Sequence, residues 1–80
     1  MENDLLQNIS KLHTTKLGAV RIQQNLSLNT TDVVQWCRES IMNPDTQISR
    51  RGKNWYAILD HNEITVNASS YTIITAHKIK

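Results

Sequence analysis

Most of the side chains suited to acid–base chemistry or phosphate binding gather in the second half of the chain, among strand-forming residues. Cleaving RNA without a metal needs a base for the 2′-OH, cations for the phosphorane charge and an acid for the leaving oxygen. His77 suits the base or the acid, because histidine exchanges protons near neutral pH. Arg50 suits the phosphate, and Tyr71 can stack a base or donate a proton. We therefore expect His77, Arg50 and Tyr71 to be catalytic.

A second group of side chains suits the binding of RNA. Lysine and arginine bind phosphate, and exposed aromatic rings stack on bases. The candidates for RNA and phosphate binding here are Arg51, Lys53, Lys78 and Tyr56. His13 lies at a helix break before two threonines, where a helix-capping or surface role competes with binding, and His61 is expected to be solvated.

Net charge is +2, and its distribution is uneven. After residue 45 the basic residues outnumber the acidic ones, which are Asp60 and Glu63. A basic sheet suits a polyanion such as RNA. The alternative is that charged strand ends and hairpin tips keep a small sheet soluble.

The residues needed for several other kinds of functional site are missing from the sequence. The two glycines, Gly18 and Gly52, are too far apart for a phosphate loop, and one cysteine with three scattered histidines gives no metal-ligand spacing. Cys37 falls on an apolar helix face, where a buried inert thiol is expected. No metal or cofactor is predicted. The lone cysteine, the lack of an apolar span and the acidic start favour a cytoplasmic protein with no membrane association.

The chain is predicted to form one α+β domain over residues 1–80, with a helical half over about 3–43. Apolar spacing predicts a helix over residues 3–11 and a second stretch in which Leu17, Val20 and Ile22 face inward. Whether residues 3–25 form one helix or two stays open. Another helix is expected over residues 30–42, capped by Asn29 or Thr30, with Val33, Cys37 and Ile41 on one face.

The sheet half, over about residues 46–78, is predicted to be a four-stranded antiparallel meander. Strands are expected over residues 46–50, 54–59, 63–67 and 70–77, because alternating and β-branched residues there are separated by short turns. Two or three helices would cover one face of this sheet. Trp55 and Tyr56 point in opposite directions, so one should fill the core and the other should be exposed.

Alternation on the last strand divides its residues between two faces. We favour Thr72, Ile74 and Ala76 as the inward set, which leaves Tyr71, Thr75 and His77 on the open face. The opposite assignment would bury Ile73 and stays an alternative.

The chain resembles two groups of proteins. The runs LGAVRI, NLSL, TDVV and NP at residues 17–44, and SYTIITAH at 70–77, resemble the superfamily that links barnase, EndoU, colicin and RelE-type ribonuclease toxins. The segments HTT from His13, GKNWY from Gly52 and YTIITAHK from Tyr71 resemble a closer family of about 80-residue bacterial and phage proteins of unknown function. That closer match covers nearly the whole chain.

The distant resemblance implies a helix–helix–sheet fold and metal-independent RNA cleavage on the open sheet face. By position it adds Thr75 to the catalytic set. Arg21 and His13 complete the set of candidate RNA-binding residues. The sequence displays no Glu–His pair like that of barnase. We therefore expect an RNA-binding protein, with a toxin-like metal-independent endoribonuclease as its most specific form. The alternatives are a non-catalytic protein-binding or inhibitor-like module and a homodimer joined through sheet edges.

Overall fold

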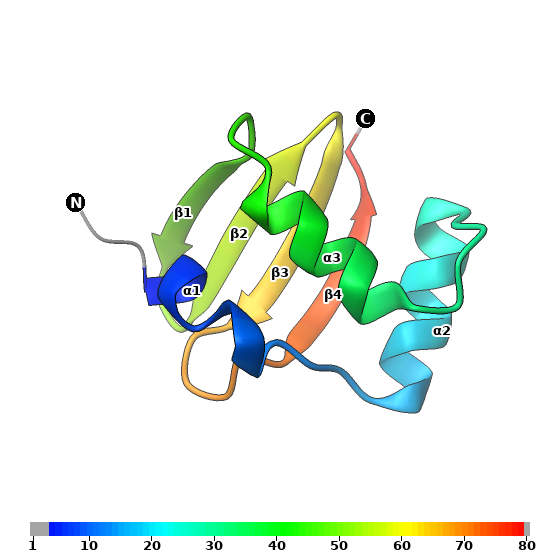
Figure 1. The fold of residues 1–80 in the computed structure, drawn as a ribbon, viewed down its shortest axis with the longest axis horizontal. Coiled ribbons are helices and arrows are strands. Elements are labelled where there is room, and N and C mark those ends of the chain that lie inside the picture. The colour runs from blue at the N-terminus through cyan, green and yellow to red at the C-terminus, as the bar shows by residue number, and fades with distance from the viewer. Residues whose placement is uncertain (1–3, 80) are drawn as a thin grey trace.

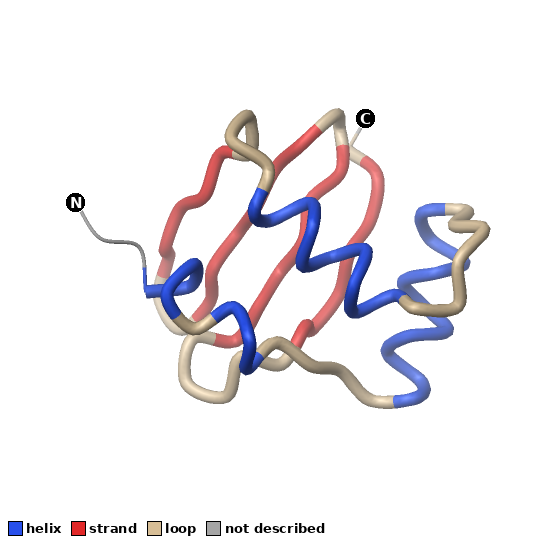
Figure 2. The backbone as a smooth tube through the Cα atoms, viewed as in Figure 1, coloured by secondary structure: helices blue, strands red, loops and turns tan. Residues whose placement is uncertain are grey.

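The computed structural model describes residues 4–79, with helices in the first half and strands in the second. A short helix α1 (Asp4–Gln7) and a 3₁₀ turn η1 (Ile9–Lys11) precede the longer helices α2 (Lys16–Leu26) and α3 (Val33–Met42). Four strands follow: β1 (Gln47–Arg51), β2 (Asn54–Leu59), β3 (Asn62–Asn67) and β4 (Ile73–Lys78). Figure 2 shows this division along the backbone.

The strands form one antiparallel sheet in the order β1-β2-β3-β4, and the helices lie on one of its faces (Figure 1). Helix α3 crosses the sheet, and α2 packs against β4. The predicted α+β fold with a four-stranded meander is confirmed. The opposite face of the sheet, called the open face below, carries no helix in the described part of the chain (Figure 1).

The helical structure is interrupted between the first and second predicted helices. Residues 12–15 separate η1 from α2, and the Thr15 side chain caps α2 by accepting a hydrogen bond from the Gly18 N–H at 3.0 Å. Residues 4–25 therefore contain two separate helical segments and a 3₁₀ turn; Asn3 lies outside the described residues. The predicted inward direction of Leu17 and Val20 is wrong, since they are 71% and 48% exposed.

Helix α3 begins after Asp32, whose side chain accepts a hydrogen bond from the Gln35 N–H. The cap is therefore Asp32 and not Asn29 or Thr30, because the Thr30 hydroxyl instead accepts from the Asp32 N–H. The predicted apolar face is confirmed, with Val33, Cys37 and Ile41 all buried. The helix ends at Met42, and its C-cap Asn43 directly precedes Pro44, which cannot continue the hydrogen-bonding pattern.

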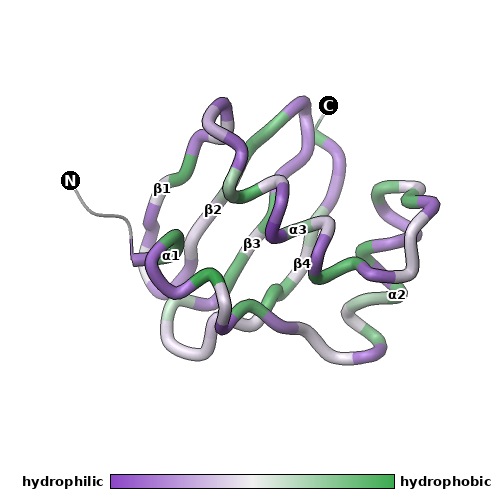
Figure 3. Tube along the Cα trace, viewed as in Figure 1, coloured by the Kyte–Doolittle hydropathy of each residue, from purple (hydrophilic) through white to green (hydrophobic). Residues whose placement is uncertain are grey.

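The core lies between the helices and the inner face of the sheet. It contains the buried side chains of Leu5, Leu12, Ile22, Leu26, Val33, Cys37, Ile41, Ala57, Ile64, Val66, Ile73 and Ala76. Figure 3 shows hydrophobic and hydrophilic residues alternating along these elements. Trp55 packs against this core, so it is the inward member of the Trp55–Tyr56 pair. Tyr56 points to the other face but is half-buried, not exposed as predicted.

Strand β4 differs from the prediction in its start and in its alternation. It begins at Ile73, because Tyr71 lies in the preceding turn with a left-handed φ of 58°. A bulge against Thr65 and Val66 then makes both Ile73 and Ala76 face inward and leaves Ile74 49% exposed. Neither sequence-based assignment of faces was fully correct, since Thr72 and Ile74 do not join Ala76 in the core.

Candidate active site on the open face of the sheet

Strand pairing arranges the residues of the open face in rows across the sheet. The first row runs through Gln47, Ile58, Glu63 and His77, and the next runs through Ser49, Tyr56, Thr65 and Thr75. These residues alternate with the buried Ala57, Ile64 and Ala76, so their side chains leave on the side without helices.

The first row contains a histidine–carboxylate pair. The His77 Nε2 lies 3.6 Å from Glu63 Oε1, and the two residues are cross-strand partners in the register of β3 and β4. The Glu63 side chain is 19% exposed and that of His77 is 47% exposed. A mostly covered carboxylate thus lies beside a histidine that solvent and ligands can reach. Such a pair can hold, give up and accept protons at adjacent positions.

Hydroxyl and aromatic groups continue the open face beside this pair. Thr75 is half-buried in the neighbouring row and pairs with Thr65, which is 6% exposed. Tyr56 follows in the same row, and the Arg51 guanidinium carbon lies 4.5 Å from its ring centroid. Tyr56 and His77 are separated by two strand spacings and one row, which puts their Cα atoms about 12 Å apart. The open face therefore holds an arginine-covered aromatic ring about 12 Å from His77.

Two of the predicted catalytic residues lie elsewhere. Arg50 points to the same face of β1 as Ile48, which is the helix side, and it is the cross-strand partner of Trp55. Its guanidinium carbon lies 5.4 Å from the Trp55 ring centroid. Tyr71 lies in the turn before β4, where its ring packs against the core beneath the Lys11 ammonium at 5.7 Å. The fold therefore brings Thr75 and His77 onto one face with Arg51, but not with Arg50 or Tyr71. The bulge and the left-handed turn explain the displacement of Tyr71.

The remaining predicted RNA-binding residues are scattered. Lys53 is exposed in the β1–β2 turn, and Arg21 is exposed on α2. Lys78 follows His77 in β4, so its side chain points to the opposite face of the sheet. His61 is exposed at the β2–β3 turn, as expected.

His13 has a structural role at the edge of β4. Its Nδ1 lies 2.8 Å from the Lys11 carbonyl oxygen and its Nε2 lies 3.1 Å from the Thr72 hydroxyl. Its backbone carbonyl also accepts from the Ile73 N–H at 2.7 Å. These contacts join residues 11–13 to the sheet, which fits the structural alternative for His13 better than contact with RNA.

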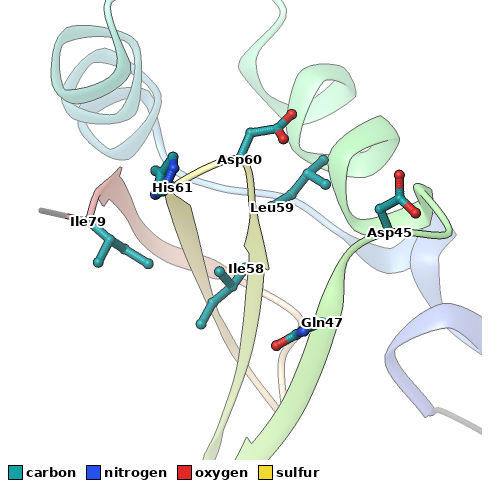
Figure 4. A pocket seen from close by; sticks show the side chains of 7 residues that line it. All are labelled: Asp45, Gln47, Ile58, Leu59, Asp60, His61 and Ile79. Atoms are coloured by element: carbon teal, nitrogen blue, oxygen red, sulfur yellow. The ribbon is translucent and has the colours of Figure 1, made fainter.

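An open groove of about 340 Å³ lies at the end of the sheet, and its lining includes Ile58, the cross-strand partner of Glu63. Figure 4 shows its lining: Ile58 and Ile79 point to one side of the sheet and Leu59 to the other, with Asp45, Gln47, Asp60 and His61 around them. Two carboxylates near its rim disfavour phosphate there. Anions are therefore favoured at the Tyr56 and Arg51 end of the open face and not at the groove.

Comparison with protein families gives one match. A family described as a protein of unknown function (DUF3781) matches residues 6–77. The chain belongs to this family. No curated protein and no solved structure matches it. The predicted membership of a family of small domains of unknown function is thereby confirmed, and the description of the family names no activity.

Other kinds of site find little support in the described residues. Within residues 4–79 no group of three or more histidine, cysteine or acidic side chains is arranged to hold a metal ion. Over the same residues no helix has the length and apolar character needed to cross a membrane.

Cys37 is buried on α3, and burial raises the pKa of its thiol from 9.0 to about 12. A raised pKa keeps the thiol protonated and non-nucleophilic at neutral pH, as expected for an inert core cysteine.

The raised pKa of Cys37 predicts a loss of stability in alkali. Between about pH 9 and pH 12 the unfolded thiol releases its proton while the native thiol keeps it, so stability falls as pH rises through this window. The free energy of unfolding of the wild type relative to Cys37→Ala should fall by about 1.4 kcal/mol between pH 8 and pH 10. Urea unfolding of both proteins under reducing conditions measures this difference. A difference that does not change with pH would contradict the prediction.

Glu63 is the site residue that sequence reasoning missed. It alternates in β3 with the apolar Ile64 and Val66, so its direction away from the core could be read from the sequence. The partner of Glu63 could not be read from the sequence, because its pairing with His77 depends on the bulge in β4.

Proposed function

We propose that this protein binds single-stranded RNA on the open face of the sheet and cleaves it without a metal. The observation that carries the proposal is the Glu63–His77 pair, with 3.6 Å between Nε2 and Oε1 on an uncovered face. Two titratable groups at this separation can act on the two oxygens of one phosphodiester.

The proposed reaction uses the RNA's own 2′-hydroxyl as nucleophile. Glu63 takes the proton from the 2′-OH, whose oxygen attacks the adjacent phosphorus. Protonated His77 gives its proton to the 5′-oxygen as the P–O bond to that oxygen breaks. The products are a 2′,3′-cyclic phosphate and a free 5′-OH, and the protons on Glu63 and His77 are then exchanged with solvent.

The neighbouring residues supply binding and charge. The Thr75 hydroxyl, one row from His77, can donate to a non-bridging phosphate oxygen. Tyr56 offers a stacking surface to a base farther along the RNA, and Arg51, held over that ring, offers a cation to a phosphate there. The basic excess of the sheet half adds sequence-independent attraction for RNA.

The experiment that tests this function is a cleavage assay on single-stranded RNA in the presence of EDTA. We expect the wild type to produce cyclic phosphate ends and to leave the same sequence made with 2′-deoxy sugars intact. Glu63→Gln keeps the shape of the side chain but removes the base, so cleavage should fall at least about 100-fold. Far-UV circular dichroism confirms that the variant is folded.

Three results would contradict the proposal. They are the absence of cleavage by folded wild-type protein, equal cleavage by Glu63→Gln, and cleavage of the 2′-deoxy substrate. The second would indicate a contaminating nuclease or other catalytic groups, and the third would exclude attack by the 2′-hydroxyl.

A further inference from the structure

The two edges of the sheet differ in how the chain covers them. At β4 the His13 carbonyl accepts from the Ile73 N–H, the Thr14 hydroxyl donates to the Ile73 carbonyl at 3.0 Å, and the Asn25 amide donates to the Ala76 carbonyl at 3.2 Å. At the other edge, β1 pairs with β2 alone within the described residues. Figure 1 shows β1 as the outermost strand. One edge is thus closed by specific contacts, while the backbone of the other is available for pairing.

The side chains of β1 give this edge a definite chemical character. Arg50 and Arg51 are consecutive and exposed, and their side chains point to opposite faces of the sheet. Each is held by an aromatic ring, Arg50 over Trp55 and Arg51 over Tyr56. The strand contains no acidic residue, and Ile48 is its one half-buried apolar side chain.

We propose that the β1 edge binds an extended acidic segment of a partner protein, which adds a fifth strand to the sheet. This inference does not depend on RNA cleavage. Consecutive residues of an added strand also alternate between faces, so two consecutive acidic residues would meet Arg50 and Arg51, one on each face. An apolar residue two positions after the second acid would lie opposite Ile48. In antiparallel pairing the recognised pattern is therefore acid-acid-x-apolar.

A second copy of β1 is a poor occupant of the same edge. Two such strands would place four arginines in one ladder with no carboxylate in either strand, so a second copy offers these arginines no opposite charge. RNA cannot add a strand to this edge, because it has no alternating amide donors and carbonyl acceptors to continue the sheet.

The test uses the full-length protein and fluorescein-labelled peptides of sequence EETVT and KKTVT, followed by fluorescence anisotropy. We expect EETVT to bind and KKTVT to bind at least about ten-fold more weakly. Arg50→Glu should weaken EETVT binding by about the same factor. Lys16→Glu is the matched control, because it makes the same change in net charge on α2, away from β1, and should bind EETVT within about two-fold of the wild type.

Backbone pairing is tested on the wild type, so the result does not depend on any variant folding. N-methylation of EETVT at amides that face β1 should abolish binding, while N-methylation at the alternate amides should leave it within about two-fold. Hydrogen exchange should also slow at amides of β1 when EETVT is added. Equal effects of N-methylation at all positions, equal binding of EETVT and KKTVT, or unchanged exchange in β1 would each overturn the proposal.

Discussion

Replacing His77 with alanine should lower the rate of metal-independent RNA cleavage by a factor of about 10²–10⁴. In the proposed reaction His77 protonates the leaving 5′-oxygen, and alanine offers no proton at that position. Its side chain is about half exposed, so its removal leaves no core cavity and should change stability by less than about 0.5 kcal/mol. The measurement is the single-turnover rate on a short RNA in EDTA, with urea unfolding to show that stability is retained.

His61→Ala is the matched control for His77→Ala. His61 is an exposed histidine of the same sheet, at the β2–β3 turn, and the proposed chemistry does not use it. Its substitution should leave the cleavage rate within about two-fold, provided that the left-handed φ of 67° at this position is tolerated by alanine, which the same urea unfolding measures. A His77→Ala protein that cleaves as fast as the wild type would remove His77 from the mechanism. Equal loss in both variants would point to non-specific damage to the sheet.

Ile22→Ala is expected to cause a large loss of stability. Ile22 is fully buried on α2, the helix that packs against β4. Truncating such a side chain costs about 2–5 kcal/mol, from lost burial and from the cavity that remains. A chain of this length has a total stability of about 4–12 kcal/mol, so the variant would keep only part of it. The urea midpoint should fall steeply, and partial unfolding near 37 °C would follow.

Val20→Ala on the same helix is the control, because it distinguishes the loss of a buried side chain from a general effect of substitution in α2. Val20 is 48% exposed, and alanine is the better helix former, so the free energy of unfolding should change by less than about 0.5 kcal/mol. Equal destabilisation by the two substitutions would mean that α2 is not anchored through Ile22.

Much of the fold could be predicted because it follows from local periodicity. Apolar spacing near 3.6 residues before Pro44 and alternation after it separate helices from strands, and turns too short for crossovers force an antiparallel meander. The buried face of α3 followed from the same spacing. Leu17 and Val20 were misplaced because periodicity identifies an apolar stripe, while the packing of Ile22 and Leu26 decides which side of α2 meets the sheet.

The candidate site was predicted only in part. Thr75 and His77 were expected on the open face and lie there, since they alternate with the inward Ala76. Arg50 was grouped with them as a cation suited to phosphate, yet it points to the helix side, while its neighbour Arg51 points to the open face.

What the sequence determined by itself was the order of the elements, the pairing of neighbouring strands and the basic character of the sheet. Tertiary structure alone decided that Glu63 and His77 meet. Beyond the bulge, Val66 pairs with Ile73, and continuing that register would place His77 opposite Asn62 on the helix side. The bulge shifts the register by one residue and turns His77 to the open face opposite Glu63. Nothing local to β4, such as a glycine, indicates that shift; it accompanies the burial of both Ile73 and Ala76 in one core.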